Sequence, residues 1–272
     1  MTGLLAWAGA FLCGARCHSA DVGQWAVVYA PVPEPAVLAG YDVVALEPDH
    51  APDLAALRKQ GTRPLGYLSL GQIHRSRPYW EDARAAGILL DASPTWPDAW
   101  RVDPRSGLWR ALVVNDLAPA ITARGFQGFL LDTLDDAAAL EHAGAAGAMA
   151  AMSDLVADLR RRQPGAFIVA NGGLALLSSI APHIDAVIVE SVWTNYDFSS
   201  GAYLRRTAGE AALREALLRD VRDRYRLPVL PLEYAERDDE ATRTWVREAA
   251  SRAGFRPYVA TISLDRLPEV AP

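Results

Sequence analysis

The stretch GFLLDTLDD, residues 128–136, places three carboxylates directly after an apolar run. The run itself, Gly128 to Leu131, is continuous rather than alternating, which is typical of a strand buried on both faces. Burying a carboxylate that has no partner is costly. Asp132 therefore marks the end of a core strand, where an acid either meets water or has a chemical task.

Similar apolar runs recur along the chain and alternate with helix-like stretches. The runs cover residues 25–30, 41–48, 63–71, 99–103, 128–132, 166–171, 184–190, 227–234 and 256–264. Helices are expected over 136–162, 210–226 and 238–254, the last with Gly254 as its C-cap. Strand and helix alternate about eight times, which predicts an α/β fold with a single (β/α)8 TIM-like barrel. A doubly wound open sheet is the alternative.

Composition limits the classes of function. The chain has 272 residues, of which 51% are hydrophobic, and a formal net charge of −6. It has no basic run, so no nucleic-acid partner is expected. No Pro-, Ser- or Gly-rich linker divides residues 21–272, which we interpret as one barrel domain. Nothing in the sequence predicts an oligomeric state.

Residues 1–20 are apolar and rich in small residues, and they are interpreted as a signal peptide with cleavage near Ser19-Ala20. The protein is then secreted or periplasmic; a poorly ordered N-terminus of a cytoplasmic protein is the alternative. The apolar stretch is too short for a membrane span. Cys13 and Cys17 both lie in it, so the mature chain has no thiol chemistry. The histidines are scattered without metal-ligand spacing, and no metal or cofactor is expected.

In a barrel of this kind the active site lies at the C-terminal ends of the strands. Asp132 ends the fifth run, and Glu190 ends the seventh. Asp135 and Asp136 fit the start of a helix, whereas Glu190 is a poor turn residue. Two carboxylates that face each other across a cleft indicate glycoside hydrolysis, with one as acid and the other as nucleophile or base.

Further polar and aromatic residues at or after the run ends are candidate substrate contacts. They are Tyr29, Asp49, Tyr67, Ser69, Gln72, Arg77, Tyr79, Asp135, Asn171, Trp193, Asp197, Glu233 and Tyr234. The glycines after Asn171 predict a tight turn that presents its side chain. Trp80, Trp193 and Tyr196 are candidates for stacking on sugar rings, with packing in the core as the alternative. An acidic cleft is expected from Glu47, Asp49, Asp103, Asp132, Asp135, Glu190, Asp197 and Glu233, and it would attract cationic sugars.

Several motifs occur in an order that resembles one family. They are LEPDH (46–50), YLSLGQIHRSRPYW (67–80), GFLLDTLDD (128–136), IVESVW (188–193), LPVLPLEYAERDDEATR (227–243) and AGFRPYVAT (253–261). The chain resembles, over about residues 25–265, the endo-α-1,4-polygalactosaminidase-like glycoside hydrolases, including the hydrolase domain of a Pel polysaccharide hydrolase/deacetylase. The resemblance implies a TIM-like barrel that cleaves α-1,4-linked galactosamine or N-acetylgalactosamine polymers and retains configuration.

The same resemblance implies that Asp132 is the nucleophile and Glu190 the general acid/base. Two departures from the family pattern affect substrate contacts and leave this pair intact. Gln72 stands where the family usually has Glu, and Glu233 stands where it usually has Asp.

Two other functions remain open from the sequence. The first is a non-catalytic polysaccharide-binding barrel in an exopolysaccharide export or biofilm system, which the Gln72 departure motivates. The second is a cytoplasmic sugar-processing barrel that uses a Schiff-base lysine or a metal. The only lysine, Lys59, lies in a helix-like stretch before the third run, which counts against the second.

Overall fold

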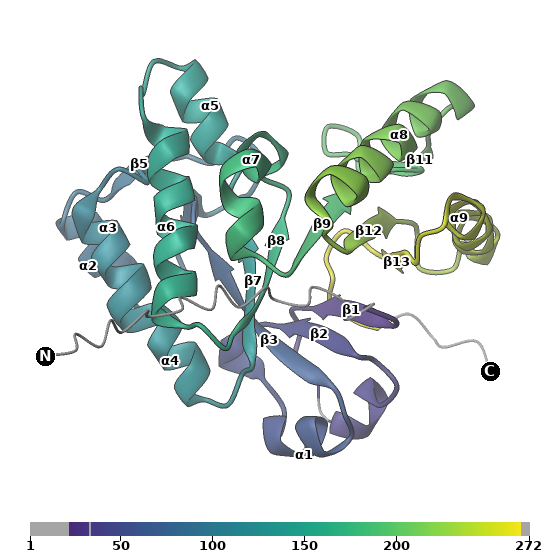
Figure 1. The fold of residues 1–272 in the computed structure, drawn as a ribbon, viewed down its shortest axis with the longest axis horizontal. Coiled ribbons are helices and arrows are strands. Elements are labelled where there is room, and N and C mark those ends of the chain that lie inside the picture. The colour runs from purple at the N-terminus through teal and green to yellow at the C-terminus, as the bar shows by residue number, and fades with distance from the viewer. Residues whose placement is uncertain (1–21, 33, 268–272) are drawn as a thin grey trace, which may run out of the picture.

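A computed structural model of the chain describes residues 22–32 and 34–267, so the predicted signal peptide lies outside the described residues. Its centre is a parallel sheet of eight strands in the order β1-β2-β3-β7-β8-β9-β12-β13, surrounded by helices (Figure 1). The strands are β1 (Trp25–Val28), β2 (Val43–Leu46), β3 (Arg63–Ser69), β7 (Gly128–Asp132), β8 (Phe167–Asn171), β9 (Ala186–Glu190), β12 (Val229–Tyr234) and β13 (Tyr258–Ala260). The α-helices are α1 (Leu54–Lys59), α2 (Trp80–Ala85), α3 (Gly107–Leu112), α4 (Ala118–Ala123), α5 (Asp136–His142), α6 (Ala148–Arg162), α7 (Leu177–Ile180), α8 (Ala208–Tyr225) and α9 (Glu240–Ala253).

The first and last strands of this sheet are joined by hydrogen bonds that involve side chains and flanking loops. The Tyr258 hydroxyl donates to the carbonyl oxygen of Val27 at 3.1 Å, and the Trp25 indole N–H donates to that of Arg256 at 3.1 Å. The backbone N–H of Tyr29 donates to the carbonyl oxygen of Leu264 at 2.8 Å. These contacts bring the two edges of the sheet together, and the predicted (β/α)8 barrel is confirmed.

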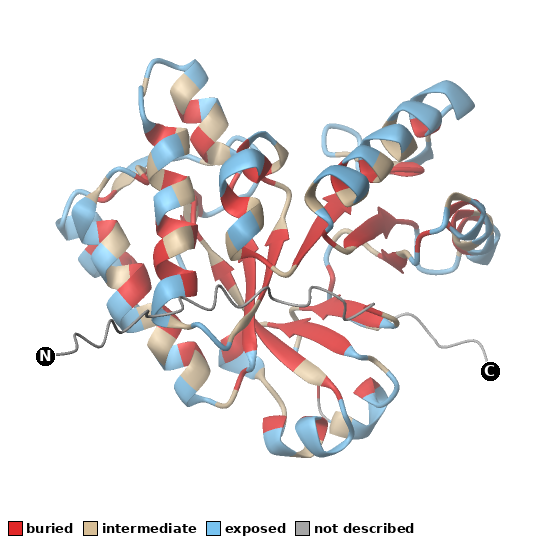
Figure 2. Ribbon diagram, viewed as in Figure 1, coloured by how far each residue is buried: buried red, intermediate tan, exposed pale blue. Residues whose placement is uncertain are grey.

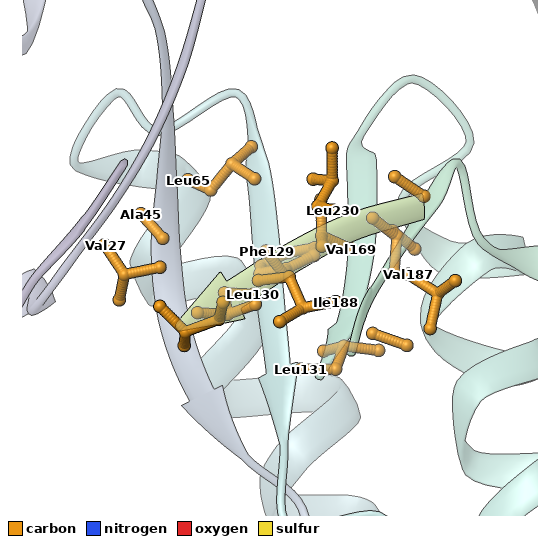
Figure 3. Packing of buried hydrophobic residues seen from close by; sticks show 14 of the residues in the cluster. Val27, Ala45, Leu65, Phe129, Leu130, Leu131, Val169, Val187, Ile188 and Leu230 are labelled. Atoms are coloured by element: carbon orange, nitrogen blue, oxygen red, sulfur yellow. The ribbon is translucent and has the colours of Figure 1, made fainter. Parts of the chain in front are cut away.

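The barrel is filled by the side chains of the apolar runs. All residues of β1 and β2 are buried, and the strands form the most buried layer of the molecule (Figure 2). Leu130, Val169 and Ile188, from three neighbouring strands, lie together in the core (Figure 3). Burial on both faces explains why the runs are continuous instead of alternating.

The prediction that residues 99–103 form a barrel strand is wrong. They form β6 (Ala99–Val102), which pairs antiparallel with β4 (Gln72–His74) and β5 (Leu89–Ala92) in a separate three-stranded sheet. Trp100 and Arg101 in this strand are only half-buried, as suits a sheet outside the barrel. The ninth run supplies the eighth barrel strand, β13, instead. Asp132 and Glu190 therefore end the fourth and sixth strands of the barrel.

The expected helix over 136–162 is two helices, α5 and α6. Gly144 and Gly147 lie between them with φ of 100° and 85°, a left-handed conformation that favours glycine and interrupts a helix. The other two predicted helices are present as α8 and α9. Gly254 has φ of 82° and caps α9, as predicted.

Candidate active site

Asp132 and Glu190 lie on either side of one amide group. The side-chain nitrogen of Asn171 donates to Asp132 Oδ1 at 2.9 Å and to Glu190 Oε1 at 2.7 Å. These two carboxylate oxygens are therefore no farther apart than the sum of those distances, about 5.6 Å. Both acids are half-buried at the C-terminal end of the barrel. The predicted juxtaposition of the pair is thus present.

Two phenols complete the hydrogen bonding of the pair. The hydroxyl of Tyr67 donates to Asp132 Oδ2 at 2.7 Å, and that of Tyr234 donates to Glu190 Oε2 at 2.7 Å. Burial, and then the neighbouring carboxylates, raise the pKa of both Tyr67 and Tyr234 well above 10. Both phenols therefore keep their protons and act as donors at neutral pH.

The sheet register explains how these residues meet. Ser69 in β3 lies opposite Asp132 in β7, and Asn171 in β8 lies opposite Ile188 in β9. Neighbouring parallel strands thus end at about the same level, and their last side chains gather at one end of the barrel.

The chain turns sharply after each of the three central residues. The next residues, Thr133, Gly172 and Ser191, have φ of 62°, 68° and 59°. A left-handed conformation is free for glycine but strained for a β-branched residue. Hydrogen bonds hold Thr133 in it: its Oγ1 accepts from the Gly71 N–H at 2.7 Å and lies 2.8 Å from the Ser69 hydroxyl. The predicted tight turn after Asn171 is confirmed.

The surroundings of Glu190 raise the pKa of its carboxyl group. Burial raises the pKa of its carboxyl group, and the nearby charges of Asp132 and Asp135 add to the rise. The donors Asn171 and Tyr234 act in the opposite direction, because they favour the charged carboxylate. The net rise brings the pKa closer to neutrality, which is the direction required for an acid that gives and takes a proton.

Glu233 and Trp193 were expected to contact substrate, but the structure places both in the interior. Glu233 is 0% exposed and Trp193 is 1% exposed. The Glu233 carboxylate accepts from the backbone N–H groups of Val192, Trp193 and Thr194 at 2.6, 3.1 and 2.8 Å, and from the Thr194 hydroxyl at 2.7 Å. The Trp193 indole N–H donates to Glu215 at 2.8 Å. Both side chains thus fix the segment that follows Glu190.

Burial and hydrogen bonding have opposite effects on Glu233. Burial raises the pKa of its carboxyl group to about 7, although the four donors favour the charged form. At neutral pH the carboxylate therefore depends on these donors, and the fold of residues 192–194 depends on the carboxylate.

Arg77 and Tyr29 lie around Tyr67. Arg77 forms a two-pronged ion pair with Glu47, at 2.6 and 2.8 Å, and its guanidinium carbon is 5.7 Å from the centre of the Tyr67 ring. The ring of Tyr29 meets that of Tyr67 edge to face with centroids 4.9 Å apart. These contacts hold the phenol that donates to Asp132.

Of the other residues predicted to contact substrate, some support the turns next to Asp132 and Asn171, and others lie farther from the two acids. Ser69 supports Thr133, and the Gln72 amide donates to Asp136 at 2.7 Å. Asp135 accepts from the Gly173 N–H at 3.0 Å, within the turn after Asn171. Asp49 is exposed and pairs with Arg124 at 2.8 Å. Tyr79 is half-buried and precedes α2.

Fewer of the expected acids contribute free negative charge to the site than the sequence indicated. Glu47, Asp49 and Asp103 are neutralised by ion pairs with arginines, and Glu233 is buried. Asp197 is bound by the hydroxyls of Ser199 and Ser200 at 2.7 and 2.6 Å, in the turn of a hairpin. Asp132 remains close to the negative charges of Glu190, Asp135 and Asp136.

Three supporting residues were not predicted as part of the site. They are Thr133, Asp136 and Arg214, whose guanidinium donates to the carbonyl oxygen of Glu190 at 2.9 Å. Thr133 adjoins a predicted acid, but no sequence pattern signals its positive φ. Arg214 comes from α8, and its distance along the chain gives no indication of this contact.

The described part of the chain contains no cluster of three or more His, Cys, Asp or Glu side chains that could hold a metal ion. Within the same residues, no helix is long and apolar enough to cross a membrane.

A pair of strand-end carboxylates on a (β/α)8 barrel is compatible with glycoside hydrolysis. The model of glycoside hydrolase family GH114 matches residues 15–271, so the chain belongs to this family and is a glycoside hydrolase. Comparison with curated proteins gave no match.

Several solved structures are similar to this chain. The glycoside hydrolase domain of PelA from Pseudomonas aeruginosa is 26% identical, with a TM-score of 0.81, covering 90% of this chain and 96% of that one. Ega3 from Aspergillus fumigatus, solved with galactosamine, is 15% identical, with a TM-score of 0.72, covering 93% and 96%. The α-galactosidase TtGalA from Thermus thermophilus is 15% identical, with a TM-score of 0.57, covering 88% and 58%. The last two are similar in fold alone.

Proposed function

We propose that this protein is a retaining endo-glycosidase that cleaves α-1,4-linked galactosamine or N-acetylgalactosamine polysaccharide. The main observation in its support is that Asp132 and Glu190 both accept a hydrogen bond from the Asn171 side-chain amide, which lies between them. Retaining enzymes hold their two carboxyl groups about 5–5.5 Å apart, whereas inverting enzymes need about 6.5–9.5 Å to admit a water molecule. The limit of about 5.6 Å between the facing oxygens supports the retaining class.

In the first step, an oxygen of Asp132 attacks the anomeric carbon as the bond to the leaving sugar breaks. Glu190 gives its proton to the departing glycosidic oxygen, and a covalent glycosyl ester forms on Asp132. Tyr67 and Asn171 hold the Asp132 carboxylate in place by donating to both of its oxygens. The raised pKa of Glu190 supports its role as the proton donor.

In the second step, Glu190 is ionised and takes a proton from water, which attacks the anomeric carbon and releases Asp132. Asn171 and Tyr234 stabilise this charged state by their hydrogen bonds to Glu190. Two displacements at the same carbon return the product to the α configuration.

The substrate class rests on the family motifs and on the 26% identity to the PelA domain. The charge of the site supports it, because Asp135 and Asp136 add negative charge near Asp132 and attract protonated amino groups. Amino sugars that carry a free amine are cationic at neutral pH, so a partly deacetylated polymer suits this site.

The test compares the wild type with Asp132→Asn and Glu190→Gln on α-1,4-linked galactosamine polymers of known acetylation. Each substitution removes one catalytic function, and loss of the acid/base alone is expected to lower the rate by about 10²–10⁴-fold. Released reducing ends and product masses report cleavage, and thermal unfolding verifies the fold. Full activity in either variant contradicts the assignment. Polymer binding by the wild type without new reducing ends favours a non-catalytic binding barrel.

We also propose that residues 1–20 direct export and that residues 21–272 form the mature barrel. The small apolar residues before Ala20 support this interpretation. N-terminal sequencing of the protein from the periplasm or medium should give a chain that starts after Ala20. Accumulation of the uncut chain in the cytoplasm would contradict it.

A further inference from the structure

Two insertions follow barrel strands at their C-terminal ends, one after β3 and one after β9. The sheet β4-β6-β5 is inserted between β3 and β7, and the hairpin of β10 (Thr194–Asp197) and β11 (Ala202–Arg205) follows β9. Trp96 lies in the turn between β5 and β6. The hairpin carries Tyr196, Phe198 and Tyr203, and Tyr196 is paired with Tyr203 across its two strands.

These four aromatic side chains form a continuous row, called here the aromatic row. The ring centroids are 4.9 Å apart from Tyr203 to Tyr196, 5.0 Å from Tyr196 to Phe198, and 5.3 Å from Phe198 to Trp96. At the other end, the Tyr203 hydroxyl accepts from the N–H of Ile262 at 3.1 Å. The row thus extends from the loop after the last barrel strand to the insertion after the third.

The middle of the row is fixed relative to Glu190. The hairpin begins four residues after Glu190, and its first residue, Thr194, is bound to the buried Glu233 through both its backbone N–H and its hydroxyl. The side chain of Asn195 accepts from Arg206 at 3.1 Å, and Arg206 also donates to the carbonyl oxygen of Ser191. The three aromatic residues of the hairpin therefore lie on the segment that directly follows the proposed acid, whereas Trp96 joins the row from the other insertion.

Trp96 and Phe198, at the end of the row away from Tyr203, are largely exposed to solvent. Trp96 is 45% exposed and Phe198 is 51% exposed, although each contacts the other. Large aromatic side chains normally bury most of their surface, and an exposed apolar patch commonly marks a binding site. Pyranose rings have apolar C–H faces that stack on aromatic rings, and a protonated amino group is attracted to the face of a Trp.

Charge on the same hairpin suits this ligand. The hydroxyls of Ser200 and Ser199 lower the pKa of Asp197 to about 2, so its carboxylate is ionised at every relevant pH. It lies one residue before Phe198 in the chain, so the turn of the hairpin carries a negative charge. An aromatic surface next to a fixed carboxylate is complementary to an amino-sugar chain that is apolar and cationic.

We propose that the aromatic row binds the polysaccharide chain beyond the sugars that contact Asp132 and Glu190. This inference rests on the proposed function and assigns Trp96, Phe198, Tyr196 and Tyr203 to the binding of sugars remote from the cleaved bond. A long polymer reaches both the carboxylate pair and the row, whereas a short oligomer reaches the pair alone. The row therefore selects for chain length.

The test measures kcat and KM of Trp96→Ala, Phe198→Ala and the double variant on a long galactosamine polymer and on a short oligomer. The double variant should raise KM on the polymer by about 5- to 30-fold, which corresponds to one or two lost stacking or cation–π contacts. KM and kcat on the short oligomer should change less than about twofold. Leu213→Ala is the control, because Leu213 is 76% exposed on α8, outside the row.

Two results would overturn the inference while the proposed function stands. One is an unchanged KM on the polymer in the double variant; the other is an equal loss on polymer and oligomer. A second measurement does not depend on cleavage: equilibrium binding of the polymer to Glu190→Gln, with and without the two alanines. Weaker binding in the triple variant supports the row even if the wild type releases no reducing ends, and equal binding refutes it.

Discussion

At the scale of single residues, the site depends on one amide with two hydrogens. The Asn171 side chain donates one to Asp132 and one to Glu190, and Tyr67 and Tyr234 occupy the outer oxygens of the same acids. Each carboxylate is thereby held by two donors in a defined orientation. The donors to Glu190 favour its charged form, so they also set the pH at which it loses its proton.

Tyr234→Phe should move the pH profile in a definite direction. The Tyr234 hydroxyl lowers the pKa of Glu190, so its removal raises that pKa further. Glu190 then keeps its proton to higher pH, and the alkaline limb of kcat/KM shifts upward. The profile is measured on a soluble oligomer, with Tyr225→Phe, at the end of α8, as the control. If the alkaline limb of kcat/KM in Tyr234→Phe stays at the wild-type pH or moves to lower pH, the hydrogen bond from Tyr234 does not control the protonation of Glu190.

The sequence predicted where Asp132 and Glu190 lie better than where their neighbours lie. Asp132, Asn171 and Glu190 each follow an apolar run, and a barrel gathers strand ends, so their meeting was predictable. Glu233 also ends such a run, yet it turns inward and accepts from residues 192–194. Whether a strand-end acid meets backbone donors or substrate depends on the path of the adjacent loop, which apolar patterning does not encode.

At the scale of elements, a neighbouring strand and a helix both contact the end of β9 and the segment after it. Three successive backbone N–H groups and the Thr194 hydroxyl donate to the carboxylate of Glu233 in β12. The backbone N–H of Tyr234 donates to the Thr194 hydroxyl oxygen at 2.9 Å. Arg214 in α8 binds the carbonyl oxygen of Glu190 itself. A neighbouring strand and a helix thus fix the position of the proposed acid.

Glu233→Gln should weaken both stability and catalysis. The amide nitrogen of Gln is a donor, so it cannot accept the N–H groups that the carboxylate accepts, and buried donors lose their partner. The free energy of unfolding in urea is expected to fall by about 1–3 kcal/mol. The kcat should fall as well, since Glu190 loses its fixed position. Wild-type values for both quantities would show that this carboxylate has no positioning role.

The aromatic row and the three-stranded sheet illustrate what the patterns missed at this scale. Residues 99–103 have the length and composition of a barrel strand, but they pair within an insertion. An apolar run identifies a strand and leaves its partners undetermined, because pairing depends on distant segments. The contact between Trp96 and Phe198 joins two insertions that are far apart in the sequence.

At the scale of the whole molecule, the barrel holds the site only if its first and last strands stay together. Tyr258 and Trp25 connect β13 and its preceding loop to β1, and their rings also pack with centroids 5.5 Å apart. Tyr29, the residue after β1, packs against Tyr67. The contacts between β1 and β13, called here the seam, are therefore connected through Tyr29 to the phenol that contacts Asp132.

Tyr258→Phe tests the contribution of the seam. The change removes the hydroxyl that donates to the buried carbonyl of Val27 and keeps the ring. Loss of one buried hydrogen bond should reduce the free energy of unfolding by about 0.5–1.5 kcal/mol. Tyr225→Phe, at the end of α8, is the matched control and should leave it unchanged. Equal stability of the two variants would indicate that this hydrogen bond adds nothing to closure of the barrel.

The central claim is that Asp132 and Glu190 act together in two successive displacements at one anomeric carbon. The most direct measurement is proton NMR of the first sugar product during cleavage of an α-1,4-linked galactosamine oligomer, before the anomers equilibrate. A retaining pair held this close predicts that the α anomer forms first and the β anomer appears later. A β anomer that forms first would contradict the account, because it would mean a single displacement by water.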